Sequence, residues 1–268
     1  MTSDASNLIT RKKIKSDAKA VLSNRDVLLK LIFCGLFYIS IEIMFELFRS
    51  YAFSAAFYKT VDERELQVYS FIFDTVCTIP YILLIYPLFI GLWKVAAGLS
   101  NDNSVEFIDI FTYYSSFKKI KKAWALALIL HLPLAIINAL FNLISLIQTD
   151  KISIQLSLWG ISLILSVVYF FTSVFITARL FPFINAVVCG ADQPISLCLN
   201  ASLKATSGKM WKLWAFPLSF IPWIFLSLLT AGVLFIIFTF PYMLIAECLY
   251  SKYLLTGEYR DHITEETL

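Results

Sequence analysis

Charged residues are scarce in this chain of 268 amino acids: they make up 15% of it, whereas apolar residues make up 59%. A soluble domain carries about 25% charged residues, because its surface must be hydrated. The few charges are also clustered, and long uncharged runs separate the clusters. This composition excludes a soluble globular protein, a disordered chain and a nucleic-acid-binding protein. It predicts a single all-α domain over residues 1–268 that crosses a membrane several times.

Signatures of catalysis and metal binding are missing as well. The five cysteines form no C-x-x-C pair and their number is odd, so we expect small buried residues in a reducing cell. The chain has no Walker loop, no H-E-x-x-H motif, no G-x-S-x-G motif and no cluster of metal ligands. The sequence therefore predicts a protein that is not an enzyme and that holds no cofactor and no metal.

Long apolar runs are what the sequence has instead. A transmembrane helix needs about 20 mostly apolar residues. An apolar stretch over residues 211–255 is long enough for two spans, and we place the turn between them at Thr230-Ala231-Gly232. The six predicted spans are residues 27–48, 72–98, 123–148, 155–181, 212–230 and 232–254. Pro80 and Pro87 predict a bend in the second of them, because proline removes a hydrogen bond of the helix.

The distribution of Lys and Arg predicts the orientation of these spans. Most of the 22 basic residues lie before the first span, between the second and third, between the fourth and fifth, or after the sixth. The opposite side has few: Arg49, Lys59, Arg64 and Lys151. Because cytoplasmic loops are rich in Lys and Arg, we expect both termini in the cytoplasm.

A predicted amphipathic helix precedes each odd-numbered span, at residues 10–24, 104–119 and 193–207. The second begins with a capping pattern over Asn103–Glu106. Each has an apolar stripe and basic residues at the membrane boundary, so we expect helices that lie at the surface of an anionic inner leaflet. The chain then consists of three units, each with one interfacial helix and one transmembrane hairpin.

Ionisable residues within or beside the spans are the candidates for function, because burying a charge in a membrane is costly. Glu42 and Glu46 lie one turn apart near the outer end of the first span, and Asp74 begins the second span at the same level. The full set is Glu42, Glu46, Asp74, Lys94, His131, Arg179 and Glu247. One interpretation is a hydrated cavity that binds a cation or a polar solute. The other is a set of residues at span ends plus one ion pair, of Glu247 with Arg179 or Lys94.

The third unit resembles a known family. It reads ISLCLNASLKATSGKMWKLWAFPLSFIPWIFLSLLTAGVLFIIFTFPYMLIAECLYSKYL, which is similar to the signature of bacterial domain-of-unknown-function family nine-seven-five. YPLFIGLWKVAAGL is similar to the middle segment of that family, and the likeness covers about residues 10–255. Thr206 and Pro222 depart from residues common in the family. The resemblance implies a six-span protein of a Gram-positive plasma membrane and assigns no catalytic or binding residue.

Three functions remain open at this point. The first is a non-enzymatic membrane component, such as a scaffold, an accessory subunit or a factor in envelope homeostasis, with a membrane protein or a second copy as partner. The second is a permease for a small solute or ion that uses the intramembrane acidic residues. The third is an intramembrane or lipid-processing enzyme. Its only support is Gly160-Ile161-Ser162, which is faintly similar to the surroundings of an intramembrane serine nucleophile.

Overall fold

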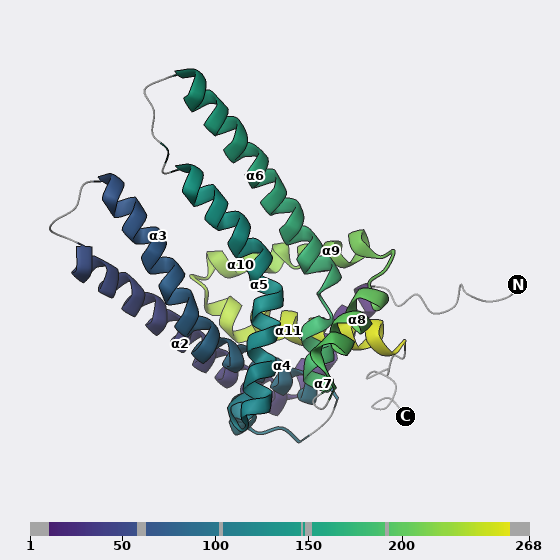
Figure 1. Cartoon of the computed structure of the whole chain (residues 1–268). Coiled ribbons are helices and arrows are strands. Elements are labelled where there is room, and N and C mark those ends of the chain that lie inside the picture. Colours follow the sequence, from purple (N-terminus) through teal and green to yellow (C-terminus); the bar gives the residue numbers. More distant parts are fainter. Residues whose placement is uncertain are drawn as a thin grey trace, which may run out of the picture.

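A computed structural model shows a protein built from helices (Figure 1). The structure describes residues 11–57, 63–101, 104–145, 147, 152–190 and 193–257. All regular secondary structure in these ranges is helical, and six helices are long and apolar enough to cross a membrane. The predicted all-α membrane protein is thereby confirmed.

The first hairpin consists of α2, Arg25–Phe57, and a long bent helix that runs back beside it. The bent helix comprises α3 (Glu63–Pro80), the π-helical segment η1 (Tyr81–Ile85) and α4 (Tyr86–Leu99). Pro87 has no N–H to donate to the carbonyl of Leu83. Trp124 on a neighbouring helix donates to that carbonyl instead, with Nε1 3.1 Å from the oxygen. The two prolines flank η1, which is where the sequence predicts a bend.

The second hairpin consists of α5, Phe117–Ser145, and α6, Ile152–Arg179. The two helices pack along each other, and their upper parts extend away from the rest of the protein (Figure 1). Only 6% of the apolar window of α6 is buried inside the protein, against 56% for the last helix of the chain. The second hairpin therefore presents most of its surface to the surroundings, whereas the last helix belongs to the core.

The third hairpin is broken twice. α9 (Met210–Leu218) and α10 (Ile221–Leu229) form its first arm, and η3 (Phe235–Thr239) and α11 (Phe240–Thr256) form its second. The turn lies at the predicted position, where Ala231 and Gly232 have φ of 49° and 84°. Glycine takes such angles without strain, which explains the choice of residue at 232. The gap between α9 and α10 interrupts the backbone hydrogen bonds within the apolar stretch.

Short helices gather at the end of the protein from which the hairpins extend, which we call the terminal side. They are α1 (Arg11–Ser23), the 3₁₀ helix η2 (Phe107–Tyr114), α7 (Phe183–Cys189) and α8 (Ile195–Ala205). We expected one helix over residues 104–119, but the chain forms η2, ends it at Ser115, and begins α5 at Phe117. The cap of η2 is a reciprocal pair of Glu106 and Asp109, and Asn103 of the predicted capping pattern lies outside the described residues.

The first of these helices, α1, is packed into the protein. Its apolar stripe, which includes Ile14, Ala18 and Leu22, is buried, mainly against α11. Arg11 and Lys15 donate to the carbonyls of Ala215 and Ser219, at 3.2 and 2.8 Å. These carbonyls lie where α9 gives way to α10, and cations stabilise the C-terminal end of a helix. We expected α1 to lie at the bilayer surface, but its stripe and two of its basic residues contact protein because the broken third hairpin offers them partners.

The core lies in the terminal half of the molecule, with α4 at its centre. Every α4 residue except Phe89, Lys94 and Gly98 is buried. η2 packs closely on α4 because position 91 is glycine: a Cβ there would lie 1.8 Å from the carbonyl oxygen of Ile110.

Candidate functional site

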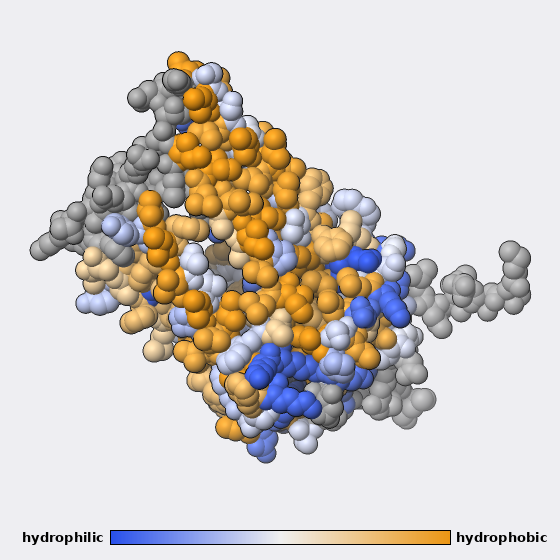
Figure 2. Space-filling view, viewed as in Figure 1, coloured by the Kyte–Doolittle hydropathy of each residue, from blue (hydrophilic) through white to orange (hydrophobic). Residues whose placement is uncertain are grey.

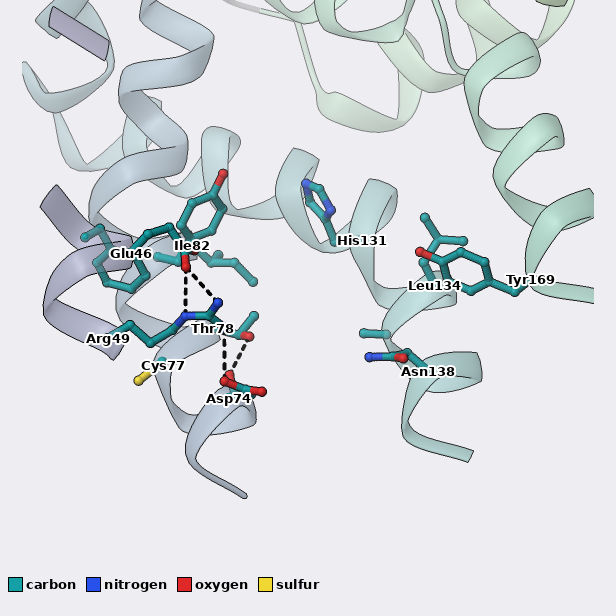
Figure 3. Close-up of a pocket in the computed structure, with 13 residues that line it drawn as sticks. Glu46, Arg49, Asp74, Cys77, Thr78, Ile82, His131, Leu134, Asn138 and Tyr169 are labelled. Carbon is teal, nitrogen blue, oxygen red and sulfur yellow. Dashed lines mark hydrogen bonds and ion pairs between the residues drawn. The ribbon is translucent and has the colours of Figure 1, made fainter. Parts of the chain in front are cut away.

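A cavity of about 420 Å³ lies between the first and second hairpins (Figure 3). Its lining residues come from α2, α3, η1, α5 and α6: Phe45, Glu46, Arg49, Asp74, Cys77, Thr78, Tyr81, Ile82, His131, Leu134, Ala135, Asn138 and Tyr169. In the space-filling view the space between the hairpins is a hollow with polar residues at its edge and apolar surface around it (Figure 2). The cavity therefore places polar groups in the middle of an otherwise apolar region.

One wall of the cavity carries a network of three charges. Arg49 on α2 donates to Glu46 Oε2 through Nε and Nη2, at 3.0 and 2.7 Å. Its Nη1 donates to Asp74 Oδ1 on α3, at 3.0 Å. The arginine thus links α2 to α3 and uses one oxygen of each carboxylate (Figure 3). Two of the acidic residues expected from the sequence, Glu46 and Asp74, are brought together in this way.

Glu42 lies behind the same wall. Tyr38 and Tyr81 both donate to its Oε1; the Tyr81 hydroxyl is 2.9 Å away. Tyr81 also lines the cavity, so the Glu42 carboxylate is hydrogen-bonded to a residue of the cavity wall without lining the cavity itself. Two phenol donors satisfy a carboxylate that would otherwise be costly within a span.

The opposite wall is polar but carries no Lys, Arg, Asp or Glu. His131 and Asn138 on α5 and Tyr169 on α6 face the charged network across the cavity (Figure 3). The imidazole of His131 meets the ring of Tyr86 edge-on, with centroids 5.3 Å apart. The cavity therefore has a charged side formed by the first hairpin and an uncharged polar side formed by the second.

The cavity extends from the middle of the apolar region to its edge. With a rise of 1.5 Å per residue, His131 lies about 14 Å along α5 from Lys122, and Asn138 about 24 Å. On α2, Arg49 lies about 36 Å from Arg25. Since the hydrocarbon core of a bilayer is about 30 Å thick, His131 is near mid-depth and Arg49 is at the boundary opposite the terminal side.

The remaining three candidates lie on the terminal side and do not meet. Lys94 donates to Thr112 on η2, at 3.1 Å. Ser202 on α8 and Thr206, which caps the C-terminal end of α8, donate to the Arg179 carbonyl, at 3.0 and 3.1 Å. Within the described part of the chain, Glu247 forms no ion pair with Lys94 or Arg179, so the predicted pairing is wrong. Depth along a helix can be estimated from sequence, but the direction in which each side chain points depends on helix packing.

A smaller cavity of about 310 Å³ also lies on the terminal side, between α4, α7 and the segment before η2. Lys94, Asn101 and Asp109 line it. Lys252 on α11 donates to Asn101, and Asp109 is occupied in the cap of η2. These polar groups have protein partners, so this cavity is explained by the packing of the core. Among the residues with described placement, no group of three His, Cys, Asp or Glu is arranged to hold a metal ion.

The chain matches the family described as "Protein of unknown function (DUF975)" over residues 8–257. It belongs to this family. The match covers all three hairpins and the short helices of the terminal side, so the architecture described above falls within the family's boundaries. No curated protein and no solved structure matches the chain.

Sequence reasoning missed several polar residues of the lining, among them Arg49, Asn138 and Tyr169, and it missed Tyr38, which donates to Glu42. Arg49 counts among the few basic residues opposite the termini, but its ion pairs with Glu46 and Asp74 depend on the rotation of two helices. Asn138 and Tyr169 are uncharged, and such residues are common in membrane helices. Tyr38 is four residues before Glu42, and that spacing on one helix face was a usable signal.

Proposed function

We propose that this protein is a non-enzymatic membrane component that binds a polar ligand in the cavity between the first and second hairpins. The observation that carries the proposal is the arrangement of Glu46, Arg49 and Asp74 opposite Asn138 and His131 around one space of about 420 Å³. Charged and polar side chains within spans are costly and are usually functional. Their gathering around an open space is explained if water and a ligand enter it.

Water access to the cavity is the first consequence that can be measured. Asn138→Cys places a thiol on the cavity wall, and Ile136→Cys places one at nearly the same depth on the exposed face of α5, outside the lining. A charged maleimide added to the protein in lipid nanodiscs reacts only with thiols that water can reach, because the thiolate is the reactive form. Mass spectrometry of the labelled peptides follows each position within the full chain.

We expect Asn138→Cys to react at least about tenfold faster than Ile136→Cys. Labelling of Asn138→Cys that is no faster than labelling of Ile136→Cys contradicts the proposal, because the cavity then gives water no better access than the outer face of α5 does. A folded state is checked by the size-exclusion profile and by unchanged reactivity of the exposed Cys189.

A permease is the second candidate, and η1 is the observation that favours it. A π-helical segment between Pro80 and Pro87 lies beside the cavity and contributes Tyr81 and Ile82 to its lining. Such segments occur often at functional sites, and a bend there can move one wall. Proteoliposomes would then take up sodium or methylammonium ions faster than empty liposomes, and Glu46→Gln with Asp74→Asn would abolish the difference. Equal uptake by protein-containing and empty liposomes would contradict the permease and would be compatible with a protein that binds its ligand without transporting it.

For location, we propose the plasma membrane of a bacterium, with both termini in the cytoplasm. The clustering of basic residues on the terminal side supports this, since Lys121 and Lys122 lie in the first two turns of α5 and Lys209 precedes α9. Anionic lipid of the inner leaflet is then a partner of this side. The family resemblance agrees with a bacterial origin.

A further inference from the structure

The cavity lies in an open space between the two hairpins (Figure 2). The two hairpins that enclose it contact each other mainly where α4 and η1 meet α5, and η1 also lines the cavity. Above that level the helix pair α2–α3 and the helix pair α5–α6 extend separately (Figure 1). The helices on the two sides of this space carry exposed apolar residues, such as Ile79 on α3 and Leu132 on α5, each next in sequence to a residue of the lining.

The charges of the cavity favour a cation. Glu46 and Asp74 contribute two carboxylates and Arg49 one guanidinium, and the Glu42 carboxylate lies just behind Tyr81. Arg49 binds Glu46 through Oε2 and Asp74 through Oδ1. The second oxygen of each carboxylate has no hydrogen bond to another described residue and can accept one from a ligand. Two carboxylates against one guanidinium leave a net negative charge at this wall, which favours a cation over an anion even though each Nη of Arg49 keeps one further N–H.

Aromatic rings complete the surroundings of such a cation. Phe45, Tyr81 and Tyr169 line the cavity on both sides. The face of an aromatic ring attracts an alkylammonium group, and carboxylates with rings together form the usual site for quaternary amines. Phe45, Tyr81 and both carboxylates come from the first hairpin, and Tyr169 faces them from the second, so the complete site includes both hairpins.

We infer that the ligand of this cavity is an amphiphile with a positively charged amine headgroup, whose alkyl chain leaves through the gap between the hairpins into the bilayer. The inference rests on the proposed binding function and adds the chemical class of the ligand. The headgroup lies between the free carboxylate oxygens of Glu46 and Asp74 and the ring of Tyr169. The alkyl chain meets the apolar helix surfaces beside the gap.

Three probes separate the parts of this inference. Decyltrimethylammonium has the cation and the chain, tetramethylammonium has only the cation, and decyl sulfate has the chain with the opposite charge. Each is added at submicellar concentration to the full-length Asn138→Cys protein in nanodiscs, and the rate of maleimide labelling is measured. We expect decyltrimethylammonium to slow labelling at least about tenfold at a concentration where the other two have no effect.

A matched pair of variants tests the role of the carboxylates. Asp74→Asn in the same protein should raise the half-protecting concentration of decyltrimethylammonium about tenfold, because one charged contact is lost. Asp26→Asn removes an exposed acid from the terminal end of α2, away from the cavity, and should leave that concentration unchanged.

The outcomes are distinguishable. Equal protection by tetramethylammonium overturns the role of the chain, and equal protection by decyl sulfate overturns the role of the charge. If Asn138→Cys is labelled rapidly but no probe protects it, the inferred ligand class is wrong while the hydrated cavity stands. If Asn138→Cys is not labelled at all, the proposed binding function itself fails.

Discussion

The hydroxyl group of Tyr81 lies 2.9 Å from Oε1 of Glu42, so the first residue of η1 donates a hydrogen bond to the middle of α2. Tyr38 donates to the same oxygen from one turn away on α2. Because Tyr81 also lines the cavity, this contact holds the charged wall in place at the level where the long helix bends. Glu42, whose charge is costly to bury in a membrane, thus helps to hold the wall of the site in place.

Removing both phenol hydroxyls should destabilise the first hairpin. We expect Tyr38→Phe with Tyr81→Phe to lower the free energy of unfolding by about 1–3 kcal/mol, because the Glu42 carboxylate loses its donors. Thermal unfolding in nanodiscs measures the change. Adding Glu42→Leu to the double variant should restore most of the stability, since no carboxylate then needs a donor. A triple variant as unstable as the double variant would show that the hydrogen bonds are not the cause.

Two glycines inside membrane helices should respond oppositely to alanine. Gly91→Ala should lower the unfolding free energy by about 3 kcal/mol or more, because the new methyl group meets the Ile110 carbonyl. Gly160→Ala on α6 meets nothing within 4 Å and should stabilise the helix by up to about 1 kcal/mol. Thermal unfolding of both variants gives the comparison. A Gly91→Ala protein as stable as the parent would contradict the close packing of η2 on α4.

The link between Arg49 and Asp74 should be weak and sensitive to salt. Their side chains are 37% and 54% exposed, and exposed ion pairs contribute at most about 1 kcal/mol. A double-mutant cycle with Arg49→Met and Asp74→Asn should give a coupling energy in that range in dilute buffer. The coupling should nearly vanish in about 1 M salt, where the Debye length is about 3 Å. A large coupling that persists in salt would mean that the network is closed off from water.

The contact of α1 with the third hairpin can be tested at Lys15. Its ammonium donates to the Ser219 carbonyl and lies 4.0 Å from the centre of the Phe220 ring. Lys15→Ala should therefore lower the unfolding free energy by about 1–2 kcal/mol. Lys12→Ala, on the exposed side of α1, serves as the control and should have no effect. Equal stability of the two variants in thermal unfolding would place Lys15 outside the support of the hairpin.

The proposed orientation has a simple test. A reporter fused after Leu268 should give a cytoplasmic signal, because six spans and a cytoplasmic N-terminus return the chain to the side on which it began. A reporter active only outside the cytoplasm would overturn either the orientation or the number of spans.

Much of the fold could be predicted from the sequence because a membrane imposes simple rules on a chain. Apolar runs of sufficient length located the six long helices, and the small residues at Thr230–Gly232 located the last turn. The role of α1 could not be predicted in the same way. An amphipathic stripe such as that of Ile14 and Ala18 packs equally well on lipid or on another helix, and the α11 surface that receives it is about 230 residues away in the chain.

The candidate site was predictable only in part. Glu46, Asp74 and His131 could be selected because charge and histidine are rare in spans, and the structure places them around one cavity. The contacts of Glu247 could not be predicted. Its depth in the membrane is similar to that of Lys94 and Arg179, but depth does not show on which face of α11 the side chain lies. Arg49 could not be recognised as a site residue from the sequence, because it lies at the boundary of the membrane, where arginine is common.

The contact between Arg11 and Ala215 joins residues 204 positions apart. At about 5–20 residues per second, a ribosome needs about 10–40 s to make the second residue after the first. During that interval α1 has neither α9 nor α11 to pack on, and its apolar stripe must rest elsewhere, with the bilayer surface as the nearest apolar medium. We therefore expect the helix to have two successive environments during the synthesis of one molecule, with completion of the C-terminal hairpin as the event that moves it from the first to the second.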